Sequence, residues 1–94
     1  MNLKFKIGEL VRASKIGHNG ITYLYGGDQR PWLKDDFHMM IPSHIPLRAG
    51  DFAVIIDGPI EDPVVKKSFF YKVLSPNGIG WARCLMIEKI KEEK

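Results

Sequence analysis

Three histidines and two neighbouring aspartates are the residues of this chain best suited to hold a metal ion. They are His18, His38 and His44, with Asp35 and Asp36 just before His38. A zinc site needs three or four ligands at about 2 Å, normally at spacings that a turn or a helix fixes. His38 and His44 are separated by a proline and fit no such spacing. We therefore expect loop histidines and no bound metal.

Cys84, the only cysteine, is the strongest candidate for a catalytic nucleophile. It follows Trp81 closely at the end of an expected strand, where a small apolar side chain normally packs in a core. No helix N-terminus is expected beneath it to favour the reactive thiolate. The pair Asp35 and Asp36 suits a helix cap better than two catalytic carboxylates. Residues 26–28 lack the following lysine of a phosphate-binding loop. The chain is expected to be no enzyme, with no cofactor and no small-molecule substrate.

Composition describes one ordinary globular domain spanning residues 1–94. Hydrophobic residues make up 45% and charged residues 27%, and the net charge of +3 is mild. Nine glycines and six prolines suit short strands joined by turns. The apolar runs are too short to cross a bilayer, and the N-terminus lacks the features of a signal peptide. These observations predict a cytoplasmic protein that contacts no membrane.

Alternating apolar residues predict strands near both ends of the chain. Val11 and Ala13 should face a core, as should Tyr71 and Val73. The run 52–56 is apolar throughout, which indicates cover on both faces. Asn77 and the glycine after it predict a hairpin turn, and one helical turn should precede the last strand. The expected strands are 8–14, 51–57, 67–74, 79–83 and 87–90, with a loop at 58–63.

Residues 15–49 form an unusually long connection between the first two of these strands. Residues 21–25 are rich in strand formers and are expected to form a hairpin with 29–33. Residues 35–38 should start one helical turn. Residues 37–47 should be extended and apolar, because their two prolines exclude a regular helix.

Eleven residues of the chain form a pattern of glycine, acidic, apolar and aromatic positions: Gly8, Glu9, Val11, Gly50, Asp51, Val54, Tyr71, Val73, Gly78, Trp81 and Ile90. In this pattern the chain resembles small SH3-like barrel proteins of bacteria and bacteriophages. The resemblance covers residues 6–14 and 50–90. It implies an all-β barrel of about five strands, with the hairpin and irregular arm at 15–49 as an insertion. It also implies a binding or structural role, such as a small phage-encoded adaptor or virion component.

A protein–protein contact or assembly module is the preferred functional hypothesis. The inserted arm should dock on a protein partner or a second copy, because extended apolar segments suit another surface or sheet edge. Deleting 37–47 is expected to abolish this contact and leave the barrel folded. The expected partner-binding residues are Phe37, Met39, Met40, Ile41, Ile45 and Leu47.

Nucleic-acid binding is the alternative. Aromatic rings that the core does not use, together with basic side chains, would form a stacking platform for a single strand. The competing interpretation is that the arm folds over the barrel and buries rings such as Tyr23 and Trp32. The basic candidates are Lys4, Lys6, Arg12, Lys15, Lys66 and Lys67.

Overall fold

The computed structural model describes residues 5–14, 20–26, 30–33, 36–63 and 65–90, except for the side chains of 33 and 36–39. Nine strands and one 3-10 turn are found in this part of the chain. They are β1 (Leu10–Ala13), β2 (Ile21–Tyr25), β3 (Trp32–Leu33), β4 (Asp36–Met40), β5 (Pro42–Arg48), β6 (Phe52–Glu61), β7 (Phe69–Ser75), β8 (Gly78–Arg83), η1 (Cys84–Met86) and β9 (Ile87–Lys89).

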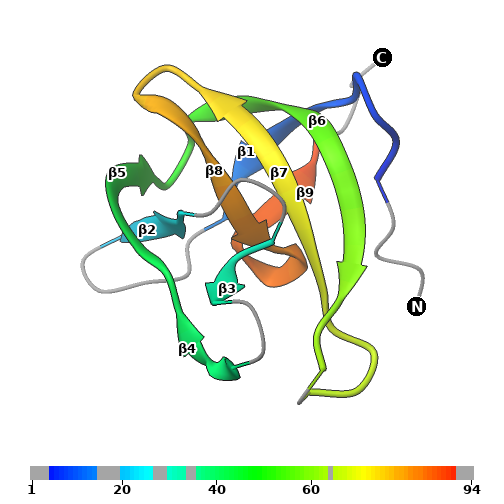
Figure 1. Cartoon of the computed structure of the whole chain (residues 1–94). Helices are drawn as coiled ribbons and strands as arrows, with labels where there is room; N and C mark the ends of the chain where they lie inside the picture. The colour runs from blue at the N-terminus through cyan, green and yellow to red at the C-terminus, as the bar shows by residue number, and fades with distance from the viewer. Residues whose placement is uncertain (1–4, 15–19, 27–29, 34–35, 64, 91–94) are drawn as a thin grey trace.

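Seven strands form one antiparallel sheet in the order β5-β2-β8-β7-β6-β1-β9. The sheet is open and strongly curled, so it makes a half-barrel around its concave face (Figure 1). Strands β3 and β4 form a separate two-stranded sheet. The all-β expectation is confirmed.

The concave face of the half-barrel holds the main core. Val11, Ala13, Tyr71 and Val73 are all buried, as their alternation predicts. The phenolic oxygen of Tyr71 accepts a hydrogen bond from the backbone N–H of Phe5 at 3.0 Å, which ties the start of the described chain to this core. The convex side of the same sheet is called the outer face below.

The C-terminal order of strand, turn, strand, helical turn and strand is confirmed by β7, β8, η1 and β9. The turn lies one residue earlier than expected. Ser75 pairs with Gly78, so Pro76 and Asn77 form the two-residue loop. Among residues 75–78, all of which the structure describes, only Gly78 has a positive φ, of 139°. The fixed φ of proline suits the first position of such a turn.

Strand β6 extends through much of the region expected to be a loop. It pairs with β7 as far as Glu61, opposite Phe69, and its register shifts between Asp57 and Ile60. The expectation of a loop at 58–63 is wrong over most of that range. Pro59 falls in the shifted register, where its missing N–H interrupts no regular ladder.

The inserted segment pairs differently from the expectation. Strand β2 pairs with β5, where Tyr23 lies opposite Pro46 and Tyr25 opposite Pro42. Strand β3 pairs with β4 instead of returning to β2. Since β5 lies at an edge of the sheet, its prolines remove no bond to a further strand. Residues 36–38 belong to β4, so the expected helical turn is wrong there; Asp35 lies outside the described residues.

Candidate functional site

The inserted arm supplies part of the core as well as the expected contact residues. Leu47 on β5 is fully buried in the main core, and Ile45 packs against that core. Met40 on β4 packs against a second cluster, and Ile41 is half-buried. The side chains of Phe37 and Met39 lie outside the described part. The contact role of the arm stays a prediction, but Leu47 has no surface to offer in this conformation.

Backbone bonds also fasten the arm to the barrel. The N–H of Gly26 donates to the carbonyl of Ile41 at 2.7 Å, and the N–H of Ile41 donates to the carbonyl of Pro31 at 2.8 Å. The Ser43 hydroxyl donates to the carbonyl of Leu24. Deleting residues 37–47 would therefore remove most of β4 and most of β5 together with these bonds. We now expect that deletion to unfold the chain.

The second cluster lies on the outer face, at the ends of β7 and β8 that the arm covers. Phe70 and Trp81 are fully buried there, and Trp32 of β3 is 9% exposed. The ring centroids of Trp32 and Phe70 are 5.7 Å apart in an edge-to-face arrangement. The expectation that the arm buries Trp32 is confirmed. For Tyr23 it is wrong, because that ring is 57% exposed on β2.

The rest of the outer face carries apolar side chains that nothing in the described chain covers. Leu10 lies opposite Val54, Val54 opposite Leu74, and Leu74 opposite Ile79, so the row crosses β1, β6, β7 and β8. Phe52 extends the row along β6. Leu10, Phe52, Leu74 and Ile79 are 50%, 52%, 47% and 49% exposed. We call these five residues the outer patch.

Sequence reasoning missed the outer patch although its signal was present. The apolar run at 52–56 predicts cover on both faces, and β6 buries Ala53 and Ile55 on one of them. Its other face is uncovered at Phe52. Exposed apolar residues that stand alone need no explanation, whereas contiguous ones mark interaction sites.

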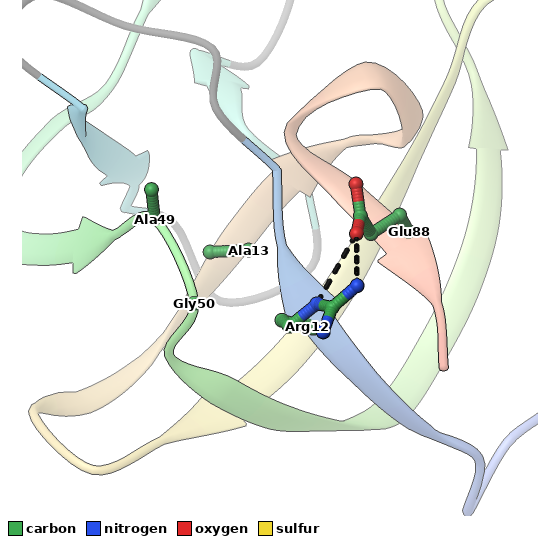
Figure 2. A pocket seen from close by; sticks show the side chains of 5 residues that line it. All are labelled: Arg12, Ala13, Ala49, Gly50 and Glu88. Carbon is green, nitrogen blue, oxygen red and sulfur yellow. Dashed lines mark hydrogen bonds and ion pairs between the residues drawn. The ribbon is translucent and has the colours of Figure 1, made fainter. Parts of the chain in front are cut away.

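An ion pair between β1 and β9 borders the patch, because its Arg12 lies opposite Phe52. Figure 2 shows the pair. Both Nε and Nη2 of Arg12 donate to Oε2 of Glu88, at 3.1 and 2.7 Å. Together with Ala13, Ala49 and Gly50, the pair lines a shallow hollow. Among its described lining residues, the titratable groups of the hollow are Arg12 and Glu88, which pair with each other.

The basic residues of the alternative hypothesis are separated in the structure. Arg12 is held by Glu88, while Lys6 is exposed before β1. Lys66 and Lys67 are exposed in the β6–β7 loop, beside a mainly apolar hollow. Lys4 and Lys15 lie outside the described residues. Because Phe70 and Trp81 are buried, these rings are not available for stacking on bases.

Arg83 forms an ion pair that is less exposed to solvent than the pair of Arg12 and Glu88. Its Nη1 donates to Oδ2 of Asp62 at 2.6 Å, and the Asp62 side chain is only 5% exposed. The guanidinium carbon lies 4.7 Å from the ring centroid of Phe70. Burial lowers the pKa of Arg83, but hydrogen bonds and charge interactions with Tyr25 and Asp62 outweigh it and leave the pKa raised. Arg83 thus stays charged and serves to fix the β6–β7 loop to β8.

Among the described residues, the remaining candidates for chemistry are not grouped into a site. Cys84 is 2% exposed in the main core, which confirms the expectation of a packed thiol. His44 is exposed on β5, and His18 lies outside the described residues. Within the described ranges, no three His, Cys, Asp or Glu side chains are grouped as metal ligands would be. In the same ranges, no helix is long and apolar enough to span a membrane.

Comparison with known proteins finds no matching family model, no matching curated protein and no matching solved structure.

Proposed function

We propose that this chain is a non-enzymatic protein–protein contact or assembly module, and that the outer patch is its contact surface. The observation that carries the proposal is the unbroken apolar row across four neighbouring strands, with Leu10, Leu74 and Ile79 each about half exposed. When another molecule covers such a row, its apolar surface is removed from water, and this favours association. Aromatic and aliphatic side chains at the centre of a patch are typical of protein interfaces.

We also propose that the half-barrel is an SH3-like barrel with an inserted arm. Five strands support this relationship by their order along the chain and by their pairing. Strand β1 lies between β6 and β9, β7 joins β6 to β8, and the 3-10 turn η1 precedes the closing strand. Strands β2 to β5 are then the insertion. A fold of this kind fixes no function, so the functional proposal depends on the surface alone.

Site-specific photo-cross-linking tests the functional proposal in cells that make the full chain. A photoreactive phenylalanine derivative replaces Phe52 in the outer patch, and in a second variant it replaces Leu85. Leu85 is the matched control, because it is 57% exposed but lies on η1, away from the patch. We expect discrete protein adducts from position 52 and none of the same mass from position 85. No adduct from position 52, or the same adducts from both positions, would overturn the proposal.

A further inference from the structure

We infer that the outer patch binds a second copy of this chain, with outer face against outer face in a symmetric dimer. This inference rests on the proposed function and names the partner. The two halves of the outer face differ in whether other side chains of the chain cover them. Trp32 and Met40 cover the half around Phe70 and Trp81, whereas no residue in the described part of the chain covers the adjoining half. This second half is therefore available to a second layer from another molecule.

The size of the patch fits a small interface between two copies. Each half-exposed large side chain offers roughly 100 Å², on the scale at which a whole aromatic side chain buries 150–250 Å². The four most exposed residues then give roughly 400 Å² per copy, about half of what each partner contributes to an interface of standard size. A polar rim supplies the remainder in ordinary interfaces. The expected dimer is weak and dissociates on dilution.

The charges around the patch allow two identical faces to meet. On one side, Arg12 is neutralised by Glu88 at 2.7 Å. On another side, Lys72 of β7 lies opposite Asp57 of β6. A symmetric interface places the same patch on both molecules, so a patch of one charge sign would repel its copy. Both of these margins carry a basic and an acidic residue, so like charges there do not oppose the contact of two copies.

The curvature of the sheet makes the contact closest at the centre of the row. Packed sheets lie about 10 Å apart, with side chains of the facing surfaces in contact. Two convex faces touch first where they bulge most and diverge at their edges. Val54 and Leu74 lie on β6 and β7, the two strands in the middle of the row. Substitutions on these strands should therefore weaken the dimer most.

Sedimentation equilibrium of the full chain over roughly a hundredfold range of concentration tests the inference. The weight-average mass of the unaltered chain should rise from 10.7 kDa towards twice that value. Leu74→Lys should hold the mass at that of the monomer over the same range. Ile79→Lys, opposite Leu74 on the next strand, should also lower the mass, so the conclusion does not depend on one variant. The control Leu85→Lys should behave like the unaltered chain, and circular dichroism checks that each variant is folded.

A monomer at every concentration overturns the inference, as does a dimer that Leu74→Lys and Ile79→Lys both preserve. The two proposals can fail separately. If the chain is monomeric but position 52 cross-links to a different protein, the second copy is wrong and the contact surface stands. If the chain is monomeric and position 52 gives no adduct, both proposals are wrong.

Discussion

Replacing Leu47 by alanine tests whether the inserted arm is part of the fold. Leu47 is fully buried in the main core, on a strand that pairs with β2. Removing a buried leucine side chain to its Cβ costs roughly 2–5 kcal/mol, because apolar contacts are lost and a cavity remains. Since the side chain has no exposed surface and lies in the main core, we expect about 3 kcal/mol here. A domain of this size then melts roughly 12–24 °C lower.

Urea unfolding followed by tryptophan fluorescence measures this change, because Trp32 and Trp81 are both buried in the folded chain. The control is His44→Ala, an exposed position on the same strand, which should stay within about 0.5 kcal/mol of the unaltered chain. A loss below about 1 kcal/mol for Leu47→Ala would refute the reasoning. The arm would then be separable from the fold, and the prediction that it docks on a partner while the barrel folds without it would hold again.

Two further substitutions test the charge contacts. Asp62→Ala removes the nearly buried acceptor of Arg83, so the free energy of unfolding should fall by about 2 kcal/mol in urea titrations; an unchanged midpoint would show that the pair does not fix the β6–β7 loop. Arg12→Ala breaks an ion pair whose side chains are 43% and 44% exposed, so the loss should stay below about 1 kcal/mol and shrink with added salt. A large loss that salt does not reduce would contradict this.

Local patterns predicted the parts of the fold in which neighbours in sequence are neighbours in space. The alternation around Val11 and around Tyr71 placed the buried side of β1 and β7 correctly. The hairpin and helical turn near the C-terminus were also predictable, because short turns leave strong signals. The coarse class, a small all-β protein, follows from these elements alone.

Long-range pairing in the inserted arm could not be predicted in the same way. Strand β2 was expected to pair with 29–33, which follow soon after it, but it pairs with β5. Proline is unfavourable in a central strand, and the edge position of β5 is what accommodates Pro42 and Pro46. Whether a strand lies at the edge or in the centre of a sheet depends on how all the strands pair. Likewise, the apolar run in β6 cannot reveal from its sequence whether its outer face finds a cover.

The two halves of the outer face separate folding from binding in this chain. Where Phe70 and Trp81 lie, the arm completes the packing, and substitutions there would disturb the folded monomer. In the outer patch, Leu74 is half exposed, so a lysine at this position can keep its charge in water and should change monomer stability little. The same lysine would place a charge in the middle of any interface formed by the patch, where it is costly. A variant that folds normally but no longer associates would therefore locate the function in the outer patch rather than in the arm.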